Sequence, residues 1–234
     1  MTEIERFPEV MLLAAGLGTR MRPLTDATPK PLIPVAGTPL IDRVITAAVT
    51  EGARRFVINA HAHADQVVAH FAGHPRVTVL REETLLGVGG GLRNGLSALT
   101  GDTLLVMNTD AFWLPEADRP LARLIARHRE IGAAMTMLCV QPGRAVGARL
   151  SHDFCLDPVG RITPDSGAPV IYTGVMVVER ALVQTLPEGK GPMAPLIAAA
   201  EAKDGLRGVH LLAPWFHVGD PEGLAEAEAR LGAA

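Results

Sequence analysis

The sequence has few cysteines, little excess charge and no run of basic residues, and each absence excludes a class of protein. Its two cysteines, Cys139 and Cys155, show neither CxxC spacing nor a Cys/His cluster, which argues against a disulfide framework and against a zinc site. The net charge is -3, and without a local run of lysine or arginine the chain offers no field for a nucleic-acid backbone. We therefore expect small-molecule partners and no nucleic acid.

The sequence also lacks a targeting segment, a linker and a repeat. Residues 1–8 include Glu3, Glu5 and Arg6 and no long apolar core, so they predict neither a signal peptide nor a membrane anchor. We expect a cytoplasmic protein with no membrane partner. No Pro/Ser-rich or low-complexity tract divides the 234 residues, and no hexapeptide repeat indicates an appended β-helix. A single domain over residues 1–234 follows.

The first 133 residues alternate between strand and helix patterns. Residues 10–15 are a short apolar run closed by Gly16, which suits a strand buried on both faces of a parallel sheet. The alternation predicts an α/β fold with a doubly wound sheet and right-handed crossovers. The predicted strands are 10–15, 55–59, 76–80 and 103–107, and the predicted helices are 40–48, 64–71, 92–99 and 121–129.

From residue 134 onward the pattern changes to shorter strand candidates separated by Gly, Pro and Asp turn signals. We expect this half to complete the sheet and to form one wall of a pocket. Its predicted strands are 134–140, 148–150 and 171–178, and its predicted helices are 193–202 and 222–231.

The loop after the first strand has the composition of a phosphate-binding turn. Gly16 and Gly18 remove Cβ atoms where the backbone turns, and amides after a strand end can hydrogen-bond phosphate oxygens. Arg20 and Arg22 add positive charge. The spacing is not that of a Walker A loop, and Met21 stands where a dinucleotide fingerprint has its third glycine. A GxG turn by itself is also typical of a structural tight turn, but its neighbours favour phosphate binding.

Lys30 follows in a segment whose backbone is restricted. It lies between Pro29 and Pro31, so we expect a non-helical chain whose φ angles are largely preset. An ammonium held in this way can neutralise phosphate oxygens without an ordering cost in the transition state. The alternative is a solvated loop lysine, and the glycines and arginines on the same segment favour the phosphate role.

Two further patterns indicate ligand contacts. Three consecutive glycines, 89–91, allow a flat backbone surface against which a base or a sugar can lie, or a plain flexible turn. The apolar strand that ends at Met107 leads to Asp110, at the carboxyl edge where ligands of open α/β sheets bind. Its carboxylate is a natural ligand for Mg2+, which can bridge phosphates, and capping of a helix is the alternative role.

The sequence resembles the sugar 1-phosphate nucleotidylyltransferases over almost its whole length. Their signature L-A-A-G-x-G-x-R, followed by P-L-T and P-K-P-L, is matched by residues 13–20, 23–25 and 29–32. The resemblance implies a Rossmann-like, three-layer α/β/α fold around a mixed sheet, with a nucleotide-binding half (1–133) and a sugar-phosphate-binding half (134–234). It implies that the catalytic residues are Arg20, Lys30 and Asp110, and that Asp110 binds Mg2+. The residues that it implies around the nucleotide are Leu13, Ala14, Ala15, Gly16, Gly18, Thr19, Arg20, Lys30, Glu82, Gly89 and Gly90.

The same resemblance implies a sugar-phosphate side and a second metal ligand. Its candidates for the sugar phosphate are Asn108, Thr173, Gly174 and Lys190. Where the family commonly has W-x-D-V-G-T, with the aspartate as a second metal ligand, this sequence has His217. A neutral imidazole is a poor ligand for Mg2+, so Asp110 and the phosphates hold the ion, another divalent ion is used, or Asp220 substitutes. Asp220 before Pro221 also has the pattern of a helix N-cap.

The implied reaction is the transfer of a nucleotidyl group from a nucleoside triphosphate to a sugar 1-phosphate, with release of pyrophosphate and no enzyme nucleophile. Positioning and charge stabilisation must then supply the rate.

Within the family, the glycine stretch, the Ala-Pro-Leu before a helix and the C-terminal pattern resemble N-acetylmuramate 1-phosphate uridylyltransferases, which implies UTP and N-acetylmuramate 1-phosphate. Mannose 1-phosphate guanylyltransferase is the alternative. A catalytically silent nucleotide-sugar binding protein, motivated by His217, is a hypothesis of a different class. We expect a monomer or a small homo-oligomer.

Overall fold

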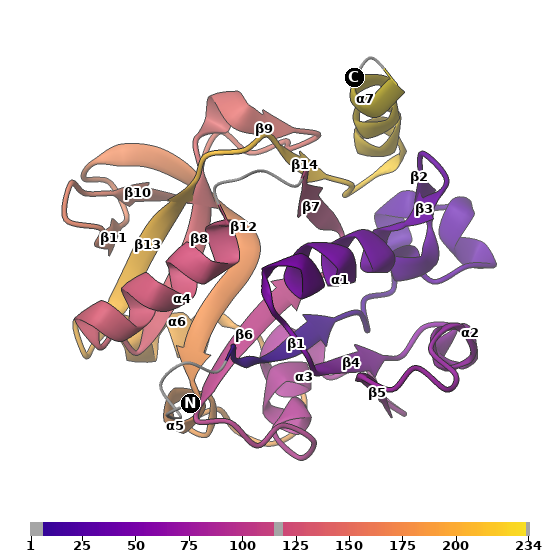
Figure 1. The fold of residues 1–234 in the computed structure, drawn as a ribbon, viewed down its shortest axis with the longest axis horizontal. Helices are drawn as coiled ribbons and strands as arrows, with labels where there is room; N and C mark the ends of the chain where they lie inside the picture. The colour runs from indigo at the N-terminus through magenta and orange to yellow at the C-terminus, as the bar shows by residue number, and fades with distance from the viewer. Residues whose placement is uncertain (1–6, 115–118, 233–234) are drawn as a thin grey trace.

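A nine-stranded mixed sheet forms the centre of the structure, a computed structural model that describes residues 7–114 and 119–232 (Figure 1). Its strands are β1 (Glu9–Leu13), β4 (Phe56–Ala60), β5 (Val77–Arg81), β6 (Thr103–Asn108), β8 (Met135–Val140), β10 (Phe154–Leu156), β11 (Ile162–Thr163), β12 (Ala168–Glu179) and β13 (Leu206–Leu211). Four parallel strands lie in the order β5, β4, β1, β6, the 3-2-1-4 order of half of a Rossmann fold. Beyond β6, β12 is antiparallel to both β6 and β8, and β13 is parallel to β8. The short strands β10 and β11 extend the sheet from the first residues of β12.

Helices cover both faces of this sheet. Their bounds are α1 (Leu40–Glu51), α2 (Ala64–His70), α3 (Gly87–Gly95), α4 (Pro120–Ile131), α5 (Arg180–Val183), α6 (Ala194–Glu201) and α7 (Pro221–Gly232). Side chains of successive strand residues point to opposite faces, so Val10 and Leu12 share a core with α1, α2 and α4, whereas Met11 shares one with α3, α5 and α6. This confirms the three-layer α/β/α fold with a mixed sheet. Among the described residues, no helix is long and apolar enough to cross a membrane.

A third core lies beside the main sheet and supports the loops that follow β1 and β6. It includes a three-stranded sheet of β7 (Ala111–Trp113), β14 (Trp215–His217) and β9 (Ala145–Val146), and residues of α7. The hairpin of β2 (Pro34–Val35) and β3 (Thr38–Pro39) packs there as well. Its buried members are Met21, Ile33, Val35, Leu40, Phe112, Phe216, Val218 and Ala227. The rings of Phe112 and Phe216 stack with centroids 5.0 Å apart, which joins β7 to β14.

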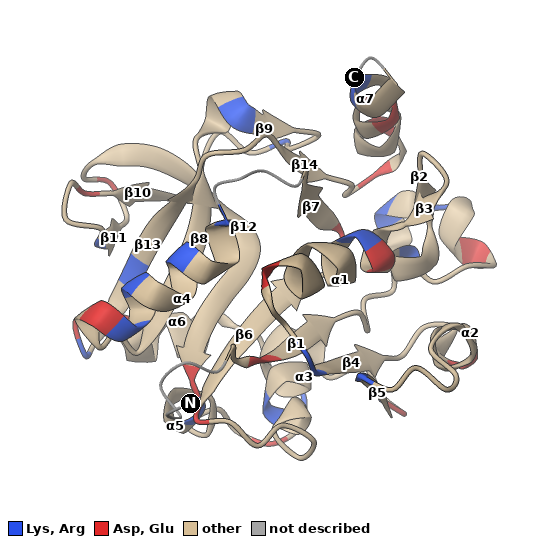
Figure 2. Cartoon of the chain, in the orientation of Figure 1, with Lys and Arg blue, Asp and Glu red and all other residues tan. Residues whose placement is uncertain are grey.

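Charged side chains are nearly absent from the central strands. β6 and β8 contain none, and β12 has one, Glu179, at its last residue. These strands are therefore almost wholly tan in Figure 2, in which most of the blue and red segments lie on helices and loops. All six residues of β8 are buried, as expected of a strand that is covered on both faces.

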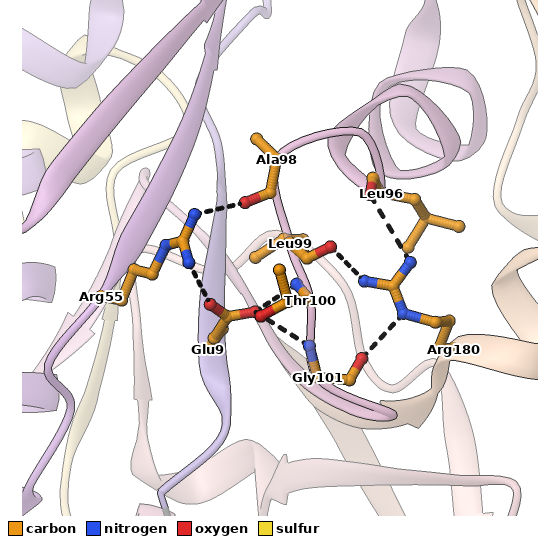
Figure 3. Close-up of polar contacts among 8 residues, drawn as sticks. All are labelled: Glu9, Arg55, Leu96, Ala98, Leu99, Thr100, Gly101 and Arg180. Carbon is orange, nitrogen blue, oxygen red and sulfur yellow. Dashed lines mark hydrogen bonds and ion pairs between the residues drawn. The ribbon is translucent and has the colours of Figure 1, made fainter.

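The loop between α3 and β6 is held from one side by Glu9 (Figure 3). Glu9 Oε2 accepts hydrogen bonds from the backbone amides of Thr100 and Gly101, and Glu9 Oε1 lies 2.9 Å from the guanidinium of Arg55. Burial by itself would raise the pKa of Glu9, but the two amides and Arg55 hold it below its ordinary value. Glu9 is therefore an ionised anchor for this loop.

Arg180 holds the same loop from the other side (Figure 3). Its guanidinium donates hydrogen bonds to the carbonyl oxygens of Leu96, Leu99 and Gly101. Leu96 and Leu99 lie just beyond the end of α3, where carbonyl groups have no partner within the helix. Arg180 and Glu9 together fix the C-terminal end of α3 against the sheet.

Most of the predicted elements are confirmed, with ends that differ by three residues or fewer. The strand predicted at 148–150 is wrong: the strand is β9, at Ala145–Val146, and Arg149 pairs instead with Glu226 of α7 at 2.9 Å. The helix predicted at 92–99 begins earlier and spans Gly87–Gly95. The segment around Lys30 was expected to be non-helical, but Lys30–Leu32 form one turn of 3-10 helix, because Pro31 lies in the first turn, where a missing amide breaks no helical bond.

Candidate active site

The loop after β1 folds back onto the segment that carries Lys30. Gly18 has a φ of 63°, in the left-handed region. A Cβ at Gly18 would lie 2.8 Å from Thr25 Cγ2 and 3.2 Å from Lys30 Cβ. The hydroxyl of Thr25 donates a hydrogen bond of 2.8 Å to the carbonyl oxygen of Gly18. Only a glycine therefore allows this close approach, which places the GxG turn beside Lys30.

Met21 anchors the same loop in the third core. Its side chain is fully buried, and its amide donates to the carbonyl oxygen of Gly18 to close a 3-10 turn, Thr19–Met21. Gly16, Thr19 and Arg20 remain exposed around this anchor. The loop thus presents the guanidinium groups of Arg20 and Arg22 to the solvent at the carboxyl edge of the sheet.

Lys30 and Asp110 form an ion pair at this edge. Lys30 Nζ donates to Asp110 Oδ2 at 2.6 Å, and the two side chains are 12% and 25% exposed. Burial by itself would raise the pKa of Asp110, but the Lys30 ammonium holds it below its ordinary value. The structure therefore brings together two of the three predicted catalytic residues, as an ammonium beside a carboxylate.

His217 lies next to this pair. β14 is antiparallel to β7 with His217 opposite Ala111, and Val218 donates a backbone hydrogen bond to Asp110. His217 Nε2 is 3.9 Å from Asp110 Oδ2, and the imidazole stacks on the indole of Trp215 with centroids 5.5 Å apart. The register of two three-residue strands thus places His217 where the sequence resemblance implies a metal ligand.

The pKa of His217 lies below its ordinary value. Burial is the largest cause, and the positive charges of Lys30 and Arg20 add to it, while Asp110 and Asp220 oppose it in part. The imidazole is therefore neutral at pH 7. A neutral imidazole suits zinc or nickel better than Mg2+.

Asp220 caps the last helix. Its Oδ1 accepts a hydrogen bond of 2.8 Å from the amide of Gly223, in the first turn of α7, and Arg149 lies 3.6 Å away. The N-cap pattern seen in the sequence is confirmed. This contact engages Asp220 with protein groups and leaves Asp110 as the carboxylate next to Lys30.

The donor set around Asp110 fits one mode of Mg2+ binding. Within residues 7–114 and 119–232 there is no group of three His, Cys, Asp or Glu side chains that could hold a metal ion, so the described part of the chain has no protein cage. Mg2+ often uses one or two carboxylates and takes its other ligands from substrate phosphates and water. Asp110, beside the loop after β1, is one carboxylate of this kind.

A buried polar network connects Ala14, in the loop after β1, to α3. Asn59, at the end of β4, accepts a hydrogen bond of 2.8 Å from the amide of Ala14 and donates one of 2.6 Å to Glu82 Oε1. Glu82 Oε2 accepts from the amide of Leu86 at 3.1 Å. Asn59 is 3% and Glu82 6% exposed, so the carboxylate of Glu82 is engaged within the protein by Asn59 and Leu86. From the sequence, Asn59 near a strand end could equally be a pocket residue or a capping residue; the structure places its side chain in this buried network.

The glycine stretch lies inside α3 and not on an open surface. The amides of Gly89 and Gly90 donate to the carbonyl oxygen of Gly191 at 3.0 and 3.2 Å, and both glycines are buried. The flat surface that the sequence suggested for a base or a sugar is thus covered, in part, by the backbone of the chain itself. Lys190, which precedes Gly191, is exposed on the loop that makes this contact.

Among the residues expected to contact the sugar phosphate, Gly174 makes room for Asn108. Gly174 has a φ of 82°, and a Cβ there would lie 2.7 Å from Asn108 Nδ2. The pairing of β12 with β8 is irregular at this point, between Tyr172 and Val175. Thr173 is 1% exposed and its hydroxyl donates to the carbonyl oxygen of Leu138, so that group is engaged within the protein. Asn108 and Gly174 meet at the carboxyl end of β6, next to Asp110.

Residues 10–210 match the family model described as the MobA-like NTP transferase domain. The sequence is 33% identical to N-acetylmuramate alpha-1-phosphate uridylyltransferase of Caulobacter vibrioides, over 96% of this chain and 97% of that protein. It is 29% identical to mannose-1-phosphate guanylyltransferase of Mycobacterium tuberculosis, over 95% of this chain and 64% of that protein. The crystal structure of HddC from Yersinia pseudotuberculosis, complexed with GMP-PN, has the same fold, with a TM-score of 0.75, 18% identity, and coverage of 96% of this chain and 100% of that one.

Proposed function

The chain belongs to the MobA-like NTP transferase family, and we propose that it transfers the uridylyl group of UTP to N-acetylmuramate 1-phosphate. Its relatives over nearly the whole chain are nucleotidyltransferases of sugar 1-phosphates, and this enzyme class applies to the chain as well. The identity of the base and of the sugar is the proposed part. The products would be the corresponding UDP-sugar and pyrophosphate.

One observation carries the mechanism: Gly18 packs against Lys30, whose ammonium lies 2.6 Å from Asp110. This contact brings the loop after β1, an ammonium and a carboxylate together at the same edge of the sheet, which supports a triphosphate site there. Amides of the loop and the guanidinium of Arg20 would hold the triphosphate, and Lys30 would neutralise charge on its phosphate oxygens. Arg20 belongs to the same turn, and its positive charge contributes to the low pKa of His217.

The reaction needs no enzyme nucleophile or general base. A phosphate oxygen of the sugar 1-phosphate, already ionised, attacks the α-phosphorus in line, and the bond between the α-phosphorus and the bridging oxygen breaks as pyrophosphate leaves. The protein contributes orientation, which can lower a barrier by roughly 7 to 11 kcal/mol, and fixed positive charge. Lys30 is preorganised for this role because its ammonium is already held in place by Asp110.

We further propose that Asp110 holds Mg2+ together with the substrate phosphates. When bound, the ion would offset the negative charge that develops on the leaving pyrophosphate. His217 would contribute little as a ligand because its imidazole is neutral and prefers softer metals. The proposed cytoplasmic location and a monomeric or small homo-oligomeric state remain predictions.

The choice of UTP and N-acetylmuramate 1-phosphate is supported by the Caulobacter vibrioides relative, which this chain matches from end to end at 33% identity. GTP with mannose 1-phosphate is the second candidate, supported by the relative from Mycobacterium tuberculosis at 29% identity. That relative extends well beyond the matched region, whereas the first is matched over 97% of its length, so the first candidate is favoured.

The test is a matrix of pyrophosphate release from UTP, GTP, CTP, dTTP and ATP, each with N-acetylmuramate, N-acetylglucosamine, mannose and glucose 1-phosphates. We expect the highest kcat/KM for UTP with N-acetylmuramate 1-phosphate, and a rate at background level for Asp110→Asn. A preference for GTP with mannose 1-phosphate would replace the first candidate with the second. Tight nucleotide-sugar binding without turnover of any pair would favour the silent binding protein instead.

A further inference from the structure

We propose that the first turn of α3 is a seat for the loop of residues 189–192, and that Gly89 and Gly90 thereby act as positioning residues for the sugar-phosphate side of the site. The inference rests on the proposed function, because Lys190 of this loop is a candidate for the sugar phosphate only through the resemblance to the sugar 1-phosphate nucleotidylyltransferases.

The loop and the helix are joined by hydrogen bonds in both directions. The carbonyl oxygen of Gly191 accepts from the amides of Gly89 and Gly90 at 3.0 and 3.2 Å, and the amide of Gly191 donates to the carbonyl oxygen of Leu86 at 2.9 Å. The first amides of a helix have no partner within the helix. Gly191 supplies that partner here, so the loop serves as the N-terminal cap of α3.

The approach is so close that side chains are excluded. A Cβ at Gly89 would lie 2.1 Å from the carbonyl oxygen of Pro192, and a Cβ at Gly90 would lie 2.1 Å from the carbonyl oxygen of Gly189. Both obstacles are backbone atoms, so a methyl group at either position must displace the loop. Glycine in a helix is disfavoured by about 1 kcal/mol relative to alanine, and the contact with the loop explains why a helix forms over this sequence nevertheless.

The opposite side of the same turn faces the nucleotide network. A Cβ at Gly91 would lie 2.5 Å from Asn59 Nδ2 and 2.9 Å from Glu82 Oε1. Asn59 in turn accepts a hydrogen bond from the amide of Ala14, in the loop after β1. The first turn of α3 therefore lies between the loop after β1 and the 189–192 loop, at the carboxyl edge of the parallel strands.

On the side toward α5, Gly90 and Gly189 line a cavity of about 590 Å³, together with Arg93 and Arg180. At its edge Arg93 lies 3.6 Å from Glu188, just before the loop. Among the described contacts of Gly191, the hydrogen bonds to Leu86, Gly89 and Gly90 hold the loop on the helix. Lys190 is exposed between Gly189 and Gly191, so its position depends directly on this contact.

The kinetic test uses Gly89→Ala and Gly90→Ala, with Gly143→Ala as the matched control. A Cβ at Gly143 has no neighbour within 4 Å, and this glycine lies outside the site. We expect each of the two α3 variants to raise KM for the sugar 1-phosphate at least tenfold and to raise KM for the nucleoside triphosphate by a clearly smaller factor. Equal effects on both substrates, or none on the sugar, would overturn the inference.

A second measurement is independent of activity, so it distinguishes failure of this inference from failure of the proposed function. Trypsin cuts after lysine, and a seated loop resists cleavage of the bond between Lys190 and Gly191. We expect slow cleavage at this bond in the wild-type protein and in Gly143→Ala, and cleavage at least tenfold faster in Gly89→Ala and Gly90→Ala, read by mass spectrometry. Unchanged cleavage, or cleavage throughout the chain in both variants, would show that the glycines do not act by seating this loop.

Discussion

Lys30 Nζ lies 2.6 Å from Asp110 Oδ2, although 80 positions separate the two residues in the sequence. Both side chains are largely shielded from solvent, at 12% and 25% exposure. Each therefore compensates the charge of the other before any substrate arrives. A triphosphate or a metal ion that enters the site finds the ammonium and the carboxylate already placed, and removal of one leaves the other without its partner.

Lys30→Ala should lower kcat/KM at least about 100-fold, which corresponds to about 2.7 kcal/mol of transition-state stabilisation. The loss arises because no other group replaces the ammonium at the phosphate oxygens. Steady-state rates of pyrophosphate release measure it, and circular dichroism shows whether the fold is intact. Lys203→Ala, which removes an exposed lysine beyond α6, should keep the wild-type rate. A near-normal rate for Lys30→Ala would exclude Lys30 from the mechanism.

The same variant should change the pH dependence of the residual activity. In the wild-type protein the Lys30 ammonium holds the pKa of Asp110 below its ordinary value, so Asp110 stays ionised and activity is lost only as the pH falls through that low pKa. Without Lys30, burial raises the pKa of Asp110, and the acid limb should move to higher pH. Profiles of kcat/KM for both proteins, at the same subsaturating concentration of Mg2+, measure the shift. Coincident acid limbs would contradict the assigned role of the ion pair.

Asn59→Asp should destabilise the protein by about 3 kcal/mol, because a second carboxylate would face Glu82 Oε1, only 2.6 Å from the present Asn59 Nδ2. Adding Glu82→Gln should recover most of this loss. The glutamine amide could then donate to the new carboxylate, while the glutamine oxygen still accepts from the amide of Leu86 and the new carboxylate still accepts from the amide of Ala14. Urea unfolding of the two single variants and the double variant gives the coupling energy. If the losses in the free energy of unfolding of the two single variants simply add in the double variant, the buried network does not hold the loop after β1 to α3.

Local patterns predicted the parts of the site that lie within one segment. Gly16 and Gly18 follow the end of β1, Asp110 follows the end of β6, and the parallel pairing of β1 with β6 brings these two loops together. Lys30 and Asp110 could therefore be expected to share a site, although not to form an ion pair.

The rest depends on contacts between distant segments. α3 carries five glycines in the nine residues of Gly87–Gly95, so its propensity opposes the helix that the loop at Gly191 completes. β13 was not predicted because Arg207, Gly208 and His210 interrupt its apolar pattern, and its pairing with β8 supplies the missing support. β7 and β14 are three residues each, too short to show a period. Tertiary pairing decided these elements.

Glu9→Gln should destabilise the fold by about 1 to 2 kcal/mol at pH 7, because the carboxylate accepts hydrogen bonds from two amides and pairs with Arg55. The pKa of Glu9 is below its ordinary value in the folded state, so this stability is fully present above pH 4.5, the ordinary value, and is lost as the pH falls through the lower, folded-state pKa. Urea unfolding should therefore show a large difference from wild type in the free energy of unfolding at pH 7 and a smaller one at pH 3.

Glu201→Gln, on an exposed residue of α6, should show no difference at either pH. A difference for Glu9→Gln that is constant with pH would contradict the ionised anchor.

His217→Asp should make the protein depend on Mg2+ for stability as well as for activity. His217 Nε2 is 3.9 Å from Asp110 Oδ2, so an aspartate there would place two carboxylates side by side, and without a cation they would repel each other. With Mg2+ the same pair becomes a two-carboxylate site, which the ion accepts readily. We expect the concentration of Mg2+ at half-maximal rate to fall about tenfold, which is about 1.4 kcal/mol. The Tm should be lower than wild type in EDTA and should recover when Mg2+ is added.

His217→Asn, which removes the imidazole without adding charge, is the matched control and should show neither effect. If His217→Asp and His217→Asn respond alike to Mg2+, the ion does not bind at Asp110, and the charge on the departing pyrophosphate must be offset by Lys30 and Arg20.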